Sequence, residues 1–192
     1  MNVLIIEDDP DICHLYSIWL QECNYNYVIT NNVEDGIDEY QKSLQQPPPP
    51  PPQQDQENSD NFINRFDLII LDYDLASKNN SNPTKNGLNV AKEILSLNKD
   101  QRIIFASAWP QKIFNDYIET LKCFIEILQK PFEKDIFIKM VQDTFVFDTL
   151  KKVVENMRSN YRDPNRPNTE NYVSLFELLW KLQKDTYGTP ER

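Results

Sequence analysis

Short apolar runs alternate along this chain with segments whose apolar residues repeat at helical spacing. Five segments are predicted to be strands: Val3–Ile6, Tyr27–Thr30, Leu68–Leu71, Ile103–Ala106 and Phe124–Leu128. Runs that are apolar at nearly every position are typical of strands buried on both faces of a sheet. The alternation therefore predicts repeated β–α units, which build a parallel sheet covered by helices on both faces.

Helical patterns fill the gaps between these strands. Asp9 can cap the first helix, and Pro10 suits its first position. Apolar residues at helical spacing mark helices over residues 12–20, 33–44, 88–95 and 113–121. A fifth helix begins at about Glu133, and we expect it to run on past residue 145 because the apolar pattern continues there.

Polar and charged side chains follow the predicted strands, at the point where each strand ends. They are Glu7 and Asp8 after the first strand, Asp72 after the third, Ser107 after the fourth and Lys130 after the fifth. Ligands of such sheets bind beyond the carboxyl ends of the strands. Any one of these residues alone fits a helix cap, a turn or a surface charge equally well. The prediction of a site therefore rests on the whole set.

The chemistry of this set favours phosphoryl binding. Clustered carboxylates repel one another, and Mg²⁺, which prefers oxygen ligands and keeps some of its waters, relieves that repulsion. A carboxylate can also attack phosphorus and form an acyl phosphate. A hydroxyl and an ammonium group can then contact the phosphoryl oxygens. The set is thus suited to holding a phosphoryl group on an aspartate.

Four short segments carry a resemblance to a known family. IIEDDP, IILDYDL, FASA and QKPF, all within residues 1–145, resemble the receiver domain of the response regulators of two-component phosphorelays. The resemblance implies a flavodoxin-like, doubly wound α/β fold with five parallel strands in the order 2-1-3-4-5. Residues 146–192 would then form a helical extension and tail.

The resemblance assigns the acidic residues to metal and phosphoryl binding. It implies that Glu7 and Asp8 bind Mg²⁺, and that Asp72 is both the phosphoacceptor and a metal ligand. Asp74 occupies the position that supplies a main-chain carbonyl to the metal.

The remaining positions of the family's site also have counterparts. Ser107 matches the switch hydroxyl, and Lys130 matches the lysine that contacts the phosphoryl group. The bond between this lysine and the following proline, Pro131, is commonly cis in the family. Gly36 and Gly87 fall at the family's usual glycine positions.

Four features depart from the family pattern. The family's switch aromatic is replaced by Ile127, and Ala76 stands where a proline is common. The loop over residues 76–87 makes the connection longer than usual by roughly seven residues. A proline-rich insertion over residues 45–61 separates the second helix from the third strand, and its six consecutive prolines favour an extended conformation. We expect it to be disordered.

The resemblance implies a stand-alone response regulator. It would receive its phosphoryl group from a histidine kinase or phosphotransfer protein, lose it by slow self-dephosphorylation and signal to a downstream protein without enzymatic turnover. One alternative is an inert receiver-like interaction module, which Ile127 and the long loop favour. Another is an aspartate-nucleophile phosphatase of the haloacid dehalogenase type, because Asp72 to Asp74 read as D-x-D. That class carries the motif after its first strand, whereas here it follows the third.

The composition excludes several other functions. The net charge of −10 argues against direct binding to DNA or to an anionic membrane. Three glycines cannot supply a glycine-rich nucleotide loop, and the single His14 cannot form a multi-histidine metal site. Cys13, Cys23 and Cys123 form no C-x-x-C pair and are interpreted as reduced packing thiols. Since no signal peptide or membrane span is evident, we expect a cytoplasmic protein.

The tail beyond residue 145 is shorter than the usual output domain, which needs about 60 residues or more. Its last segment, Tyr172–Leu182, is apolar on nearly all sides, so a helix there must be buried. Two arrangements stay open. The helix folds back onto its own receiver, or it packs against a partner, as in a homodimer.

Overall fold

A computed structural model of the chain describes residues 1–45, 65–75, 87–110, 113, 125–160 and 169–188. Most of the proline-rich insertion and of the 76–87 loop, nearly all of the predicted helix over 113–121, and Cys123 lie outside these residues. The chain divides into two compact units, Met1–Ile103 and Ile104–Arg192. No helix in the described ranges is long and apolar enough to cross a membrane.

Five strands form one sheet in the order β2-β1-β3-β4-β5. They are β1 (Asn2–Ile6), β2 (Asn26–Thr30), β3 (Leu68–Asp72), β4 (Arg102–Ser107) and β5 (Glu126–Gln129). The predicted fold class and strand order are confirmed. Every residue of β3 and β4 is buried, whereas most of the edge strand β2 is partly exposed. The continuous apolar runs therefore mark the strands at the centre of the sheet, as the sequence predicts.

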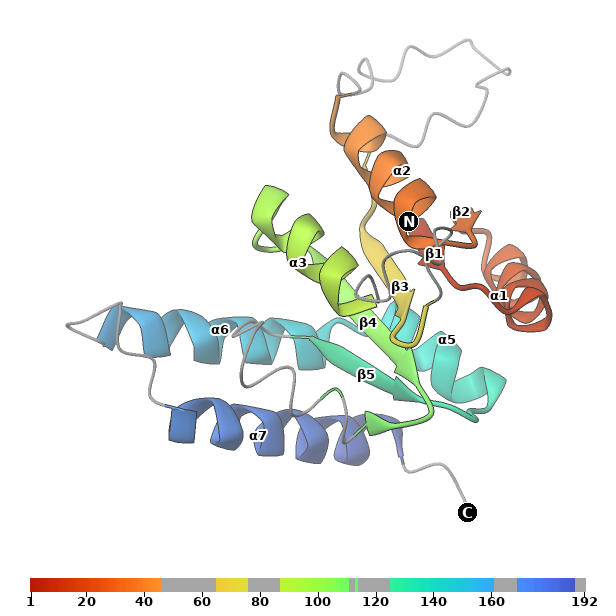
Figure 1. Cartoon of the computed structure of the whole chain (residues 1–192). Helices are drawn as coiled ribbons and strands as arrows, with labels where there is room; N and C mark the ends of the chain where they lie inside the picture. Colours follow the sequence, from red (N-terminus) through yellow and green to blue (C-terminus); the bar gives the residue numbers. More distant parts are fainter. Residues whose placement is uncertain (46–64, 76–86, 111–112, 114–124, 161–168, 189–192) are drawn as a thin grey trace, which may run out of the picture. The chain divides into compact units, whose positions relative to one another are not determined.

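The first unit contains β1–β3 with the helices α1 (Pro10–Glu22), α2 (Val33–Gln45) and α3 (Gly87–Leu97) (Figure 1). The predicted cap of α1 is confirmed, because Asp9 Oδ1 accepts hydrogen bonds from the main-chain N–H groups of Asp11 and Ile12 at 2.9 and 3.2 Å. Helix α2 places Gly36 against the side chain of Ile6 in β1, where a Cβ atom would collide with it. This close approach explains the glycine.

The second unit contains most of β4, the strand β5 and the helices α5 (Lys134–Gln142), α6 (Phe145–Asn160) and α7 (Thr169–Tyr187). The expectation of one helix running past residue 145 is wrong, because α5 ends at Gln142 and Asp143 has an extended backbone. The Asp143 carboxylate accepts a hydrogen bond from the N–H of Phe145 at 2.7 Å. A side chain that binds its own neighbouring main chain competes with the helix, so a new helix begins here.

The tail helix α7 packs against α6 and α5 of the same unit, and Figure 1 shows α6 and α7 side by side. Leu175 and Leu179 of α7 are buried almost completely. The structure thus has the arrangement that the fold-back alternative expects for the apolar tail.

Candidate functional site

An acidic cluster lies where β1 and β3 end in the first unit. The two strands pair in parallel with Ile6 opposite Leu71, so Glu7 and Asp72, the next residue on each strand, emerge side by side. One carboxylate oxygen from each of Glu7, Asp8 and Asp72 lies within 4.8 Å of the others. The structure therefore brings together the three acids that the sequence predicts as metal ligands.

Two of these three carboxylates are buried. The exposed fractions are 1% for Glu7 and 7% for Asp72, whereas Asp8 is exposed. Burying like charges next to one another is costly unless a cation compensates them. Because all three donors are hard oxygen atoms at one place, the cluster fits a hard divalent cation such as Mg²⁺, with waters completing its shell.

The main chain and the carboxylate of Glu7 both form hydrogen bonds with neighbouring residues. Its N–H donates to the carbonyl of Thr30 in β2 at 3.0 Å, and its carbonyl accepts from Cys13 Sγ at 3.3 Å. Its carboxylate accepts from the N–H of Asp9 at 3.4 Å. The main chain of Glu7 is thus held by β2 and by α1, and its carboxylate is contacted by the N–H of Asp9 just before α1.

Tyr16 is a neighbour of this cluster that the sequence reasoning assigned only to the apolar stripe of α1. It is fully buried and packs edge-to-face on Trp19, with ring centroids 6.4 Å apart. Burial, reinforced by the charges of Glu7 and Asp72, raises the pKa of its phenol well above the ordinary value. A neutral phenol therefore borders the acids. The one sequence feature that could have indicated this role is that Tyr16 is a tyrosine in an otherwise mostly aliphatic stripe of α1.

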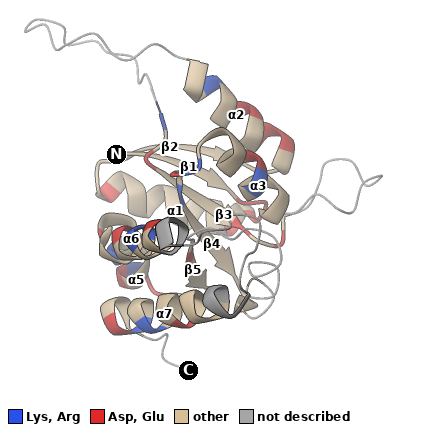
Figure 2. Ribbon diagram, turned by 90° about the vertical axis from the view of Figure 1, so that its left-hand side faces the viewer, with Lys and Arg blue, Asp and Glu red and all other residues tan. Residues whose placement is uncertain are grey.

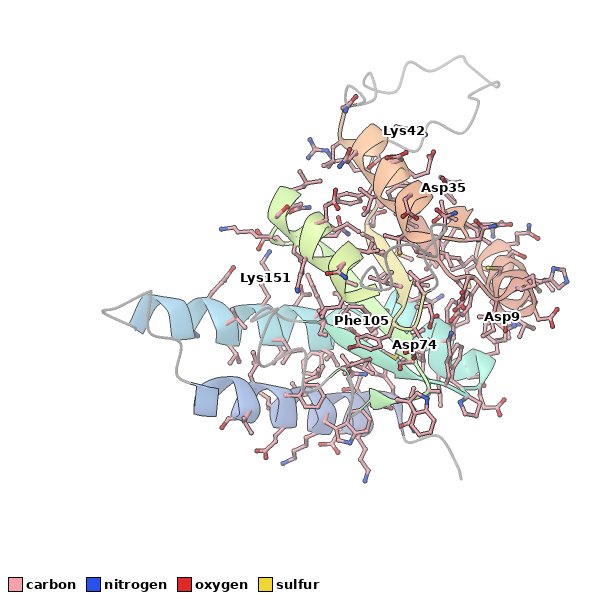
Figure 3. All side chains as sticks on the ribbon, in the orientation of Figure 1. Asp9, Asp35, Lys42, Asp74, Phe105 and Lys151 are labelled. Atoms are coloured by element: carbon pink, nitrogen blue, oxygen red, sulfur yellow. The ribbon has the colours of Figure 1, made fainter. Side chains whose placement is uncertain are left out.

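Asp74 lies in the turn that follows β3 (Figure 3). Its side chain is exposed, whereas Tyr73 and Leu75 on either side are buried. The carboxylate of Asp74 is not one of the three that cluster. This placement fits a residue whose predicted contribution is a main-chain carbonyl.

Ser107 and Lys130 lie at the ends of β4 and β5 in the second unit. The N–H of Lys130 donates to the carbonyl of Ser107 at 2.8 Å, which ties the two strand ends together. The Ser107 hydroxyl is fully buried and accepts a hydrogen bond from the N–H of Trp109 at 3.0 Å. The Lys130–Pro131 bond is cis, as the resemblance predicts.

Solved structures that share this fold include several receiver domains. The chemotaxis protein CheY4 of Vibrio cholerae is 21% identical over 73% of this chain and 95% of its own, with a TM-score of 0.52. The response regulator TrrA of Thermotoga maritima, solved with Mg²⁺ and beryllofluoride, is 24% identical over 73% and 96%, with a TM-score of 0.50.

A third structure extends the likeness to more of the chain. A CheY-like receiver domain of Methanospirillum hungatei is 13% identical over 83% of this chain and 98% of its own, with a TM-score of 0.50. No protein-family model and no curated protein matches the sequence. The chain therefore has the fold of the response-regulator receiver domains.

Proposed function

We propose that the chain is a response regulator that accepts a phosphoryl group on Asp72 from a histidine kinase or phosphotransfer protein. One observation carries the proposal: Glu7, Asp8 and Asp72 gather their carboxylates within 4.8 Å at the ends of β1 and β3 of a receiver fold. These residues, with the main-chain carbonyl of Asp74, would hold Mg²⁺.

In the proposed transfer, a carboxylate oxygen of Asp72 attacks the phosphorus atom of the donor. A new P–O bond forms, the bond from phosphorus to the donor breaks, and an acyl phosphate results. Without a cation, the charges of Glu7 and Asp8 would repel the incoming phosphoryl group. Water later hydrolyses the acyl phosphate slowly and restores the carboxylate, so the chain signals and does not turn over a metabolite.

The resemblance gives Ser107 and Lys130 the roles of phosphoryl contacts. Their places at the carboxyl ends of β4 and β5 support this assignment, since ligands of doubly wound sheets bind beyond those ends. The hydroxyl of Ser107, which accepts from the N–H of Trp109, would donate its own proton to a phosphoryl oxygen. The ammonium group of Lys130 would pair with another.

We infer that the output is a contact with another protein in the cytoplasm. The sequence carries a net charge of −10, and Figure 2 shows acidic residues along α2. A nucleic-acid backbone repels such a surface.

The test is incubation of the full chain with acetyl phosphate and Mg²⁺, followed by intact-protein mass spectrometry. We expect the mass gain of one phosphoryl group, lost in Asp72→Asn. Asp38→Asn is the matched control: it removes an exposed acid on α2 outside the proposed site, so it should still be phosphorylated. If the wild type gains no phosphoryl group from acetyl phosphate or from any cognate kinase, the proposal is wrong.

The same sample separates the two rival functions. Continuous release of phosphate from p-nitrophenyl phosphate, abolished by Asp72→Asn, would indicate the aspartate-nucleophile phosphatase. Absence of both Mg²⁺ binding and phosphoryl gain would indicate an inert interaction module.

A further inference from the structure

The tail helix α7 is joined to the edge strand β5 by a pair of buried hydrogen bonds. The N–H of Ile127 donates to Gln183 Oε1 at 2.9 Å, and Gln183 Nε2 donates to the carbonyl of Ile127 at 2.6 Å. Both residues are buried, with exposed fractions of 2% and 7%. The side-chain amide of Gln183 therefore forms hydrogen bonds with both main-chain polar groups of Ile127, as a neighbouring strand would.

The same face of α7 makes further contacts one turn to either side. Tyr187 donates from its hydroxyl to the carbonyl of Asp143, between α5 and α6, at 3.3 Å, and lies 3.5 Å from Glu126 Oε1. Leu179, one turn before Gln183, is buried. Leu179, Gln183 and Tyr187 share one stripe of the helix because they are four residues apart.

The position of this contact in β5 is informative. Ile127 occupies the place where the family resemblance expects the switch aromatic. It lies three residues before Lys130, whose own N–H is bonded to the Ser107 carbonyl. The main chain that α7 contacts thus belongs to β5, the strand that ends just before Lys130, one of the proposed phosphoryl contacts.

We propose that α7 is a latch whose docking on β5 through Gln183 is coupled to phosphorylation of Asp72. The inference rests on the proposed function. The two hydrogen bonds to Ile127 hold the main chain of β5 in the conformation that this structure shows. A helix that binds this conformation favours it over any conformation in which β5 shifts.

The proposal assigns a direction to this coupling. If a phosphoryl group draws Lys130 and Ser107 to new positions, the movement of β5 strains the Ile127–Gln183 pair and loosens α7. By reciprocity, loosening α7 strengthens the binding of a phosphoryl group or its mimic at Asp72. Release of the latch uncovers the main-chain N–H and C=O of Ile127 at the edge of the sheet.

The first test is hydrogen–deuterium exchange on the full chain with and without acetyl phosphate and Mg²⁺, with the extent of phosphorylation read by mass. We expect exchange in α7 to rise roughly tenfold or more on phosphorylation, the effect of losing a pair of hydrogen bonds. Exchange in α1 should stay unchanged. A fully phosphorylated chain whose α7 exchanges no faster would overturn the latch and leave the proposed function intact. Failure to phosphorylate would overturn both.

The second test is the affinity for Mg²⁺ with beryllofluoride, an equilibrium mimic of the phosphoryl group. Gln183→Ala should bind the mimic about fivefold tighter or more and exchange faster in α7 without any donor. Gln183→Glu keeps the side-chain size but sets a carboxylate against the Ile127 carbonyl, so it should act in the same direction. Lys181→Ala, exposed on the same helix, is the control and should match the wild type.

Wild-type affinity in both Gln183 variants, with unchanged exchange in α1 as proof of folding, would contradict the coupling. Faster α7 exchange without tighter binding of the mimic would contradict it as well, since α7 would then be only a structural cover.

Discussion

Gly87 begins α3 directly against the carbonyl group of Asp72, so that a Cβ atom at residue 87 would overlap the Asp72 oxygen. The Gly87 N–H also donates to the carbonyl of Tyr73 at 3.2 Å. The first turn of α3 therefore packs directly against the main chain of Asp72, the proposed phosphoacceptor. Only a residue without a side chain permits this approach.

Gly87→Ala should displace the main chain of Asp72 or push α3 away from it. We expect a loss of about 1–3 kcal/mol in the free energy of unfolding, the usual cost of overpacking. Phosphorylation by acetyl phosphate should slow as well, because the acceptor moves relative to Glu7. Urea unfolding and the rate of phosphoryl gain measure the two effects. Lys92→Ala, exposed on the same helix, should change neither, and a Gly87→Ala chain equal to it would contradict the prediction.

The strands and the acidic cluster could be predicted from sequence because their signals are local. Leu68–Leu71 is apolar at every position, and such a short run is typical of a strand buried on both faces of a sheet. Parallel strands bring their carboxyl ends to one edge, so Glu7 and Asp72 meet although 64 residues separate them. Asp9 before Pro10 likewise marks the start of α1 by a cap that acts within one turn.

The features that could not be predicted depend either on a side-chain hydrogen bond that competes with helix formation or on a contact between residues far apart in the sequence. The helix break at Asp143 escaped because apolar residues continue through it, and the deciding interaction is the hydrogen bond from the Phe145 N–H to the Asp143 carboxylate. The bond between Gln183 and Ile127 joins residues 56 positions apart. A glutamine in an amphipathic helix carries no sign that its amide will meet an edge strand.

Removing one acid from the cluster should weaken Mg²⁺ binding and, without metal, stabilise the fold. Asp8→Asn relieves the repulsion among Glu7, Asp8 and Asp72, so the metal-free variant should unfold at a higher temperature than the metal-free wild type. Its affinity for Mg²⁺ should fall by roughly 10–100-fold, the loss that even an outer partner of a metal ligand causes. Calorimetric titration and thermal unfolding in EDTA measure these effects.

The matched control for this experiment is Asp38→Asn, which removes an exposed acid on α2. It should leave the Mg²⁺ affinity within error of the wild type. An Asp8→Asn chain that binds Mg²⁺ as tightly as this control would show that the cluster is not the metal site.

Asp9 should behave as a helix cap and not as a metal ligand. Asp9→Ala leaves the N–H groups of Asp11 and Ile12 without their acceptor, and we expect it to cost about 1 kcal/mol in stability. Asp9→Asn keeps a side-chain oxygen and should cost much less. Both variants should retain wild-type affinity for Mg²⁺ in calorimetric titration. Equal destabilisation by both, or a large loss of affinity in Asp9→Asn, would assign Asp9 to the acidic cluster instead.

Tyr40 should make the stability of the chain fall in alkaline solution. Burial raises the pKa of its phenol above the ordinary value of 10.0. The unfolded chain therefore loses this proton at lower pH than the folded chain, so stability is complete below about pH 10 and falls as pH rises toward the folded value. Urea unfolding across that range should show a steeper decline in the wild type than in Tyr40→Phe.

At neutral pH the same variant should be the less stable chain. The Tyr40 hydroxyl donates to Gln101 Oε1 at 3.0 Å, and the loss of this buried hydrogen bond should cost about 1 kcal/mol. The two stabilities should therefore converge as pH rises above 10, since only the wild type carries the ionisable phenol at residue 40. If the stability curves of the wild type and of Tyr40→Phe stay parallel over the whole pH range, folding does not raise the pKa of Tyr40 and the prediction is wrong.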